Sequence, residues 1–295
     1  MSSSTAASAA RVGVSDARAV RRHRFGTVLT YSFLLSLAVV YIFPFVISIA
    51  TSFKTEPDAT ANPLALVPNP PTTAAFHDLS QNQDFFLWVK NSVIVTLSVT
   101  ILRVFLDSLA GYALARLRFR GRAAVFTTVV LVMAVPGVVL LIPKFLIIRQ
   151  FGIYDTYYGM IIPLLVDAAG VFIMKNFFES IPVSVEESAR IDGANIFQIY
   201  WLIVLPMARP ALVTLFILSF QGSWNELAHF IVSAQSTSLN TLTKGDAQLA
   251  SGQLGSGNRY PLKLAASVLM TIPVAVLFFF FQRRIMNASS GAVKE

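Results

Sequence analysis

The sequence predicts an all-α, polytopic membrane protein with six transmembrane helices. Hydrophobic residues make up 55% of the 295 residues, the mean hydropathy is +0.65, and only 13% of the residues are charged. Soluble domains carry about 25% charged residues, so too few charged side chains are present to solvate a water-soluble fold of this length. The chain has no cysteine, which excludes a disulfide scaffold, a thiol nucleophile and a Cys-ligated metal.

Six apolar stretches are long enough to cross about 30 Å of hydrocarbon, which takes about 20 helical residues. The first stretch is uncharged and no small-residue cleavage site follows it, so we expect an uncleaved anchor. The stretches form one transmembrane domain, 25–282, between a polar, basic tail expected to be mobile, 1–24, and a short tail, 283–295. The predicted spans are 25–50, 91–115, 123–148, 159–178, 210–232 and 264–282.

Basic residues predict the orientation of these spans. Most of the 23 Lys and Arg residues lie in the two tails and in the connections that follow the second and fourth spans. Because basic connections stay in the cytoplasm, both termini are expected there. The net charge of +8 therefore needs no nucleic acid, since the basic residues are dispersed and not interleaved with aromatic residues. Topology and contact with anionic head groups are the expected roles of Arg116, Arg118, Arg120 and Arg122.

The connection between the fourth and fifth spans, residues 182–206, predicts two short helices joined by a glycine, and we call it the elbow. Ser184 followed by Glu187 predicts a capping box at the start of the first helix. Gly193 is placed to end that helix in a left-handed conformation, which other residues adopt only at a cost.

The second helix of the elbow is apolar on nearly every face, so we expect it to be buried or to lie at the membrane boundary. Asn195 and Gln198 repeat the capping pattern at its start. Pro206 is expected to end it, and Pro210 suits the first turn of the fifth span. A capped helix–glycine–helix elbow on the cytoplasmic face is suited to docking a partner.

The elbow resembles the EAA…G…I-x-L-P loop of ABC importer permeases. The match comprises Glu187-Ser188-Ala189, then Gly193, then Ile203-Val204-Leu205-Pro206, and Ser188 stands where the first Ala is usual. The substitution is small and compatible with a helix. The resemblance implies coupling to an ATPase by Glu187, Ser188, Ala189, Asp192, Gly193, Ile203, Leu205 and Pro206.

Further segments are similar to the carbohydrate-uptake branch of these permeases, typified by the smaller permease subunit of the maltose transporter. They are 52–55, 112–119, 224–226, 265–269 with Pro273, and 291–294. The resemblance implies a substrate path lined by Trp224, Asn225 and Glu226. It also implies a C-terminal tail contact made by Gly291, Ala292, Val293 and Lys294.

The same resemblance implies a multi-pass permease of a prokaryotic plasma membrane that works by alternating access and catalyses no reaction itself. Its implied partners are a second homologous permease subunit, a cytoplasmic ATPase dimer, an extracytoplasmic solute-binding protein and the lipid bilayer. ATP and Mg belong to the ATPase, and no cofactor is expected on this chain. A phosphate-binding P-loop ends in Gly-Lys-Ser/Thr, and no Gly-Lys pair occurs in the sequence.

Ionisable residues inside the spans leave alternatives open. Arg103 and Asp107 lie four residues apart on one helical face, which favours a mutually neutralising pair or a contact with the second permease over substrate binding. Asp167 and Lys175 carry no assigned role, although Lys175 can snorkel to the cytoplasmic surface. A stand-alone ion-coupled secondary transporter, using Asp107, Asp167 or Glu226, is the alternative function, and a structural membrane adaptor is a third. The three His residues share no metal-ligand spacing, so no metal site is predicted.

Overall fold

The computed structural model describes residues 4–82, 84–253 and 259–291. Within those ranges every regular element is a helix, in agreement with the all-α prediction. Of the predicted C-terminal tail contact, Gly291 is the last helical residue, while Ala292, Val293 and Lys294 lie outside the described residues. The long elements are α1 (Ser4–Ser52), α4 (Phe85–Arg116), α8 (Ala168–Ser180), α12 (Arg209–Trp224) and α15 (Tyr260–Gly291).

Shorter helices connect the long ones. Those before the elbow are α2 (Glu56–Ala61), α3 (Ala74–Asn82), α5 (Arg122–Met133), η1 (Gly137–Leu140), α6 (Leu141–Gln150), α7 (Tyr157–Ile161) and η2 (Ile162–Leu164). The elbow contains α9 (Val183–Ile191), α10 (Ile196–Gln198), the π-helical η3 (Ile199–Val204) and α11 (Leu205–Met207). After α12 come α13 (Ala228–Ser233), η4 (Thr237–Leu239) and α14 (Leu242–Ala250).

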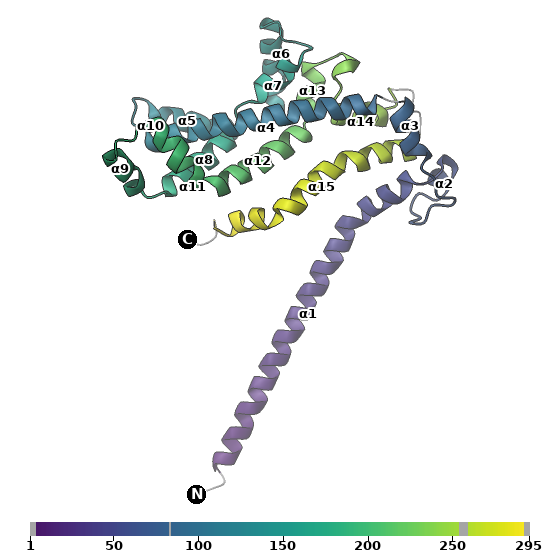
Figure 1. Cartoon of the computed structure of the whole chain (residues 1–295). Coiled ribbons are helices and arrows are strands. Elements are labelled where there is room, and N and C mark those ends of the chain that lie inside the picture. The colour runs from purple at the N-terminus through teal and green to yellow at the C-terminus, as the bar shows by residue number, and fades with distance from the viewer. Residues whose placement is uncertain (1–3, 83, 254–258, 292–295) are drawn as a thin grey trace.

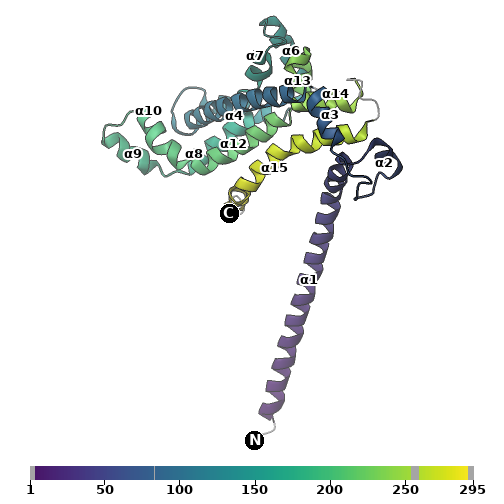
Figure 2. The same ribbon diagram turned by 45° about the vertical axis from the view of Figure 1, so that its right-hand side comes forward.

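Three predicted spans are continuous helices long and apolar enough to cross a membrane: Thr27–Ser52, Phe85–Arg116 and Tyr260–Gln282. The first belongs to α1, which projects away from the other helices (Figures 1 and 2). Its apolar side chains from Val28 to Ile49 are largely exposed. The described part of the predicted tail 1–24 is helical, because α1 already begins at Ser4 and runs on into the first span. Its Ala and Arg residues are among the strongest helix formers.

The other three predicted spans are broken. In the third span Arg122–Met133 and Gly137–Gln150 meet at 104°, and in the fourth Tyr157–Leu164 and Ala168–Ser180 meet at 41°. A further bent pair, Ile196–Met207 and Arg209–Trp224, meets at 78° where the elbow joins α12, just before the predicted fifth span begins. Six crossings result only if each bent pair is one span. Pro136 precedes the first bend, and a proline disfavours the helical conformation in the residue before it.

The predicted fifth span, 210–232, is not one helix either. α12 ends at Trp224 and the chain resumes as α13 at Ala228. The apolar pattern runs through both helices, so hydropathy alone did not reveal the interruption at residues 225–227.

The long helix α4 is the centre of the bundle. It packs against α8 and α12, and α15 lies along α12 and the end of α1 (Figure 1). Gly111 lets α4 approach α8 closely, because a β-carbon at that position would lie 2.7 Å from Cβ of Met174. Tyr112, Phe178 and Tyr200 form part of the adjoining apolar core, which joins α4, α8 and the elbow.

A second set of contacts ties together the connections at the opposite end of the bundle from the elbow. Asp155 accepts hydrogen bonds from the Ser236 hydroxyl and from the backbone N–H groups of Gln235 and Ser236. These bonds, those of Ser236 foremost, lower the pKa of the Asp155 carboxyl. The buried Lys244 ammonium donates to the Ala234 carbonyl at 2.7 Å. The segment around α13 is therefore attached to both the α6–α7 turn and α14.

Single cysteines should report the orientation, because the native chain has none. Asn69, Ser251 and Arg120 are exposed, the first two in connections expected outside and the third in one expected inside. A membrane-impermeant maleimide should label Asn69→Cys and Ser251→Cys in intact cells, and Arg120→Cys only after lysis. The neighbouring Gly121 is unsuitable for a cysteine because its φ of +86° is a conformation that residues with a side chain adopt only at a cost. Equal labelling of Arg120→Cys before and after lysis would contradict cytoplasmic termini.

Candidate functional site

The first helix of the elbow, α9, begins two residues earlier than the capping pattern predicted. Pro182, with φ −57°, is the N-cap and has no side chain to cap with. Ser184 therefore lies inside the first turn, where its carbonyl accepts from the Ser188 hydroxyl at 2.9 Å. The capping box of Ser184 and Glu187 is wrong. A proline-fixed φ is enough to start the helix here.

Gly193 ends α9 as predicted, with φ +83°. Its N–H donates to the Arg190 carbonyl at 3.1 Å, and the next N–H, of Ala194, donates to the Ala189 carbonyl at 2.9 Å. These two bonds are those of a Schellman motif, which requires a left-handed residue at the position of Gly193. The turn between the two arms of the elbow is thus fixed by backbone chemistry.

The second arm begins with the predicted capping box. The Asn195 side chain accepts from the Gln198 N–H at 2.9 Å, and the Gln198 side chain accepts from the Asn195 N–H at 2.8 Å. The arm then widens into the π-helix η3 and continues to Met207, so Pro206 lies inside the last turn and does not end the arm. A proline has no N–H to donate to the preceding turn, a common cause of local unwinding.

Burial divides the predicted coupling residues into two groups. Glu187, Ser188, Asp192 and Gly193 are exposed, whereas Ala189 is buried in the core beside Ile199 and Tyr200. Ile203 and Leu205 pack against that core and Pro206 is half-buried. One face of the elbow is therefore anchored and the other is free.

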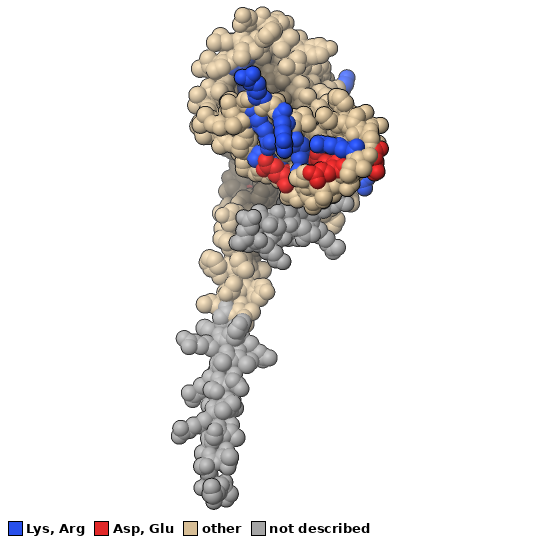
Figure 3. Space-filling model, turned by 90° about the vertical axis from the view of Figure 1, so that its left-hand side faces the viewer, with Lys and Arg blue, Asp and Glu red and all other residues tan. Residues whose placement is uncertain are grey.

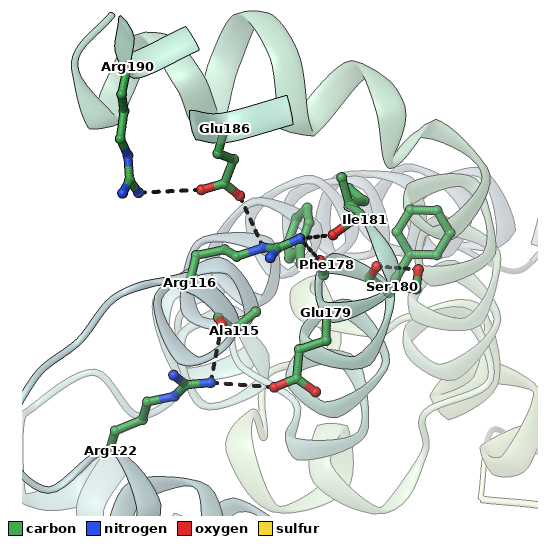
Figure 4. A network of polar contacts seen from close by, with 10 residues as sticks. Ala115, Arg116, Arg122, Phe178, Glu179, Ser180, Ile181, Glu186 and Arg190 are labelled. Carbon is green, nitrogen blue, oxygen red and sulfur yellow. Dashed lines mark hydrogen bonds and ion pairs between the residues drawn. The ribbon is translucent and has the colours of Figure 1, made fainter. Parts of the chain in front are cut away.

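Arg116, the last residue of α4, anchors the elbow (Figure 4). Its Nε lies 3.0 Å from Oε1 of Glu186 on α9, and the two side chains are 8% and 3% exposed. Its Nη2 donates to the carbonyl oxygens of Phe178, at 2.5 Å, and Ile181, at the end of α8. One guanidinium thus joins α4, α8 and α9.

This anchor was missed in the sequence. The sequence predicts a role in topology and head-group contact for Arg116, and it predicts Glu187, not Glu186, as the functional glutamate of the elbow. The helical period could have indicated that Glu186 is buried, because Glu186 and Ala189 lie three residues apart and therefore on the same face of the helix. A charged residue on the buried face needs a partner, and Arg116 is that partner.

A more exposed ion-pair network lies beside the anchor. Glu179 contacts Lys175 at 2.8 Å and Arg122 at 3.4 Å, so Lys175 has a partner on its own helix. Figure 3 looks at the end of the molecule that carries α9, where basic side chains gather next to acidic ones. Exposed charged residues of this end include Arg118, Arg120, Glu187, Arg190 and Asp192.

The predicted substrate-path residues lie where α12 ends. Trp224 is buried, stacks on Phe220 and donates its indole N–H to the Met270 carbonyl at 3.1 Å. Asn225 is the exposed C-cap, and the half-buried Glu226 accepts from the His229 N–H at 2.9 Å. The structure thus separates a packing residue from two polar residues at a helix interruption.

Of the two arrangements expected for Arg103 and Asp107, the mutual ion pair is not formed. Arg103 Nε donates to the Leu164 carbonyl at 2.7 Å. Asp107 is fully buried and its Oδ1 accepts from the Asp167 N–H at 3.1 Å. Both side chains therefore contact the backbone at the bend between η2 and α8. Within the described residues, no cluster of three or more His, Asp or Glu side chains could hold a metal ion.

Comparison with known proteins identifies the family. Residues 107–288 match the model of the binding-protein-dependent transport system inner membrane component. The chain belongs to this family. It is 32% identical to a polygalacturonan/rhamnogalacturonan transport system permease of Bacillus subtilis, over 92% of this chain and 99% of that one. It is 30% identical to an arabinooligosaccharide transport system permease of Halalkalibacterium halodurans, over 90% of this chain and 96% of that one.

A solved structure agrees with this membership. A bacterial ABC transporter involved in the import of the acidic polysaccharide alginate matches with a TM-score of 0.77 and 25% identity, over 89% of this chain and 97% of that chain. The chain is therefore a multi-pass membrane permease of a binding-protein-dependent transport system. This membership favours an importer subunit over a stand-alone ion-coupled transporter or an adaptor.

The buried anchor predicts a stability difference between two glutamates on neighbouring helices. Glu186→Gln leaves Arg116 buried without its counter-charge, and breaking a buried pair costs about 3–5 kcal/mol. Glu179→Gln removes an exposed pair worth about 1 kcal/mol or less. The apparent unfolding temperature of the detergent-purified transporter should therefore fall much further for Glu186→Gln. Equal shifts for the two variants would show that the anchor carries no special weight.

Proposed function

We propose that the chain is one of two permease subunits of an ATP-driven carbohydrate importer, and that its substrates are oligosaccharides. The related permeases named above serve polygalacturonan/rhamnogalacturonan and arabinooligosaccharides, and the matching structure takes part in alginate import. All three names describe chains of linked sugars. A solute-binding protein on the outside and a second permease subunit beside the chain complete the proposed transporter.

The observation that carries the proposal is the free face of the elbow. Ile191 and Phe197 are 86% and 75% exposed, at a turn that also exposes Glu187 and Asp192. Large apolar side chains beside charged ones at the tip of an anchored helix pair mark a protein-binding surface. We assign this surface to a cleft of the cytoplasmic ATPase dimer, which holds the ATP and Mg.

The anchored face supplies a route for movement. Because Arg116 joins α9 to the ends of α4 and α8, a displacement of the elbow by the ATPase displaces both helices with it. Alternating access then follows if the two permeases rock against each other, opening the path outward when the ATPase dimer closes. Both termini remain cytoplasmic in this scheme, and the C-terminal tail from Gly291 onward contacts the ATPase.

The substrate path is proposed to pass Asn225 and Glu226. A helix interruption leaves polar backbone and side-chain groups available, and such groups are tolerated at membrane depth only where protein or a water-filled path surrounds them. An exposed amide and a half-buried carboxylate can donate to and accept from sugar hydroxyls. Trp224 supports them by packing.

The elbow assignment predicts uncoupling without loss of the bundle. Gly193→Pro cannot adopt φ +83° because proline fixes φ near −65°, whereas Gly193→Asn can. Oligosaccharide uptake by the reconstituted transporter should fall by about tenfold or more in Gly193→Pro, because proline also lacks the N–H that bonds the Arg190 carbonyl and a loss of about 1.4 kcal/mol at the docking turn is a factor of ten. Gly193→Asn should stay near wild type.

Glu187→Lys tests the free face in the same assay. Reversal of this exposed charge should reduce the ATPase stimulation by the loaded binding protein, while the yield of assembled bundle stays unchanged. Glu187→Gln is the matched control and should be milder. Stimulation at wild-type level in Glu187→Lys and Gly193→Pro would reject the coupling role.

The substrate path is tested by variants that separate charge from packing. Glu226→Gln retains an oxygen for the His229 N–H, so a loss of uptake reports the missing charge. Asn225→Leu should also reduce uptake. Trp224→Phe removes the bond to Met270, worth about 1 kcal/mol, and should lower assembly more than uptake. Uptake of arabino- and galacturono-oligosaccharides is measured per assembled transporter. A loss that only follows assembly would make Asn225 and Glu226 structural.

A further inference from the structure

The bend between η2 and α8, residues 165–167, leaves backbone groups that a continuous helix would pair. Helix ends present unpaired carbonyls at the C-terminus and unpaired N–H groups at the N-terminus. At membrane depth each such group costs several kcal/mol unless a partner is supplied. This bend therefore requires partners from a neighbouring element.

α4 supplies a partner to each side of the bend. Arg103 donates to the carbonyl of Leu164, the last residue of η2, at 2.7 Å. One turn further along α4, Asp107 accepts from the N–H of Asp167, the N-cap of α8, at 3.1 Å. The cation meets the negative end of one helix and the anion meets the positive end of the other, so both agree with the helix dipoles.

Steric contact shows how closely the carboxylate is seated. A β-carbon at Gly170 would lie 2.1 Å from Oδ2 of Asp107, so the first turn of α8 admits the side chain only because residue 170 is glycine. Asp107 is fully buried and its Oδ2 has no hydrogen-bond partner. The carboxylate is held in place by the bond of its other oxygen and by this close fit.

Arg103 also reaches the second interruption. A β-carbon at Gly222 of α12 would lie 3.9 Å from Nη1 of Arg103, three residues before the C-cap Asn225. The guanidinium therefore lies between the bend that precedes α8 and the end of α12 where the proposed path begins.

We propose that Arg103 and Asp107 form a clamp on α4 that holds η2 and α8 at one angle, and that they are positioning residues for transport. α8 is then held at both ends by α4, through Asp107 at its N-terminus and Arg116 at its C-terminus. Movement of the elbow passes along α8 as a rigid lever to Arg103 and the path. This inference rests on the proposed function only in that the movement is taken to drive transport; the clamp itself rests on the contacts of Arg103 and Asp107.

The test measures the angle directly. Spin labels at the exposed Tyr158 on α7 and Asn176 on α8 span the bend, in the transporter assembled with cysteine-free partner chains. A reference pair at Phe86 and Leu102, both exposed on the unbroken α4, should be insensitive to the clamp. In the native chain the distribution of Tyr158–Asn176 distances should be narrow, and its mean should be the same in the nucleotide-free and vanadate-trapped states.

Three variants separate the clamp from general damage. Asp107→Leu removes the acceptor, and Gly170→Ala displaces the carboxylate without changing it. Both should broaden the Tyr158–Asn176 distance and reduce uptake of galacturono-oligosaccharide per ATP by about tenfold, the equivalent of about 1.4 kcal/mol. Asp107→Asn retains an acceptor oxygen and should keep the narrow distance. Gly170→Ala replaces Asp107→Leu if the latter does not assemble.

Two results would overturn the clamp. One is an unchanged distance in both Asp107→Leu and Gly170→Ala. The other is a broadened distance with native uptake per ATP, which would leave Arg103 and Asp107 without a positioning role while the importer assignment stands. If none of the oligosaccharides is transported by the native chain, the substrate class fails, and the distance measurement still decides the clamp.

Discussion

The requirement that no backbone polar group be left unpaired at membrane depth governs this fold. Three of the predicted spans are broken, and each break exposes helix ends. On α4 the charged residues Arg103, Asp107 and Arg116 each contact a helix end: the C-terminus of η2, the N-terminus of α8 and the C-terminus of α8. Each charge has the sign that the helix dipole favours. These hydrogen bonds offset the cost of placing ionisable residues inside a membrane protein, and they also supply the partners that the exposed helix ends need.

This arrangement gives α4 a mechanical role that its hydropathy hides. α8 continues through Ile181 and Pro182 into the elbow, and Arg116 fixes that junction to α4. The elbow is anchored by charge on one face and exposes Ile191 and Phe197 on the other. A partner that binds the exposed face consequently moves a unit of three helices, and the apolar core around Tyr112 keeps that unit together.

The sequence predicted what depends on local chemistry or on overall polarity. The all-α class, the left-handed Gly193 and the Asn195–Gln198 capping box are confirmed. The helix breaks near Pro136 and Asp167 were not predicted, because a hydropathy window averages over single residues of this kind and gives one continuous apolar stretch. The prediction that Ser184 caps α9 was wrong because the helix already begins after Pro182. The partners of Arg103, Asp107 and Arg116 are backbone carbonyls, an N–H group and a carboxylate on other helices, which no pattern within α4 encodes.

Adjacent residues in α9 show why burial, not residue type, decides the role of a charge. Glu186 and Glu187 are chemically identical, yet about 100° of helical rotation places one against Arg116 and the other in solvent. In the buried position a carboxylate must be paired, and its removal leaves an unpaired guanidinium. In the exposed position a carboxylate is free to contact another chain. The elbow can therefore be both rigidly attached to its own bundle and available to a partner, because the two tasks fall to different faces of one short helix.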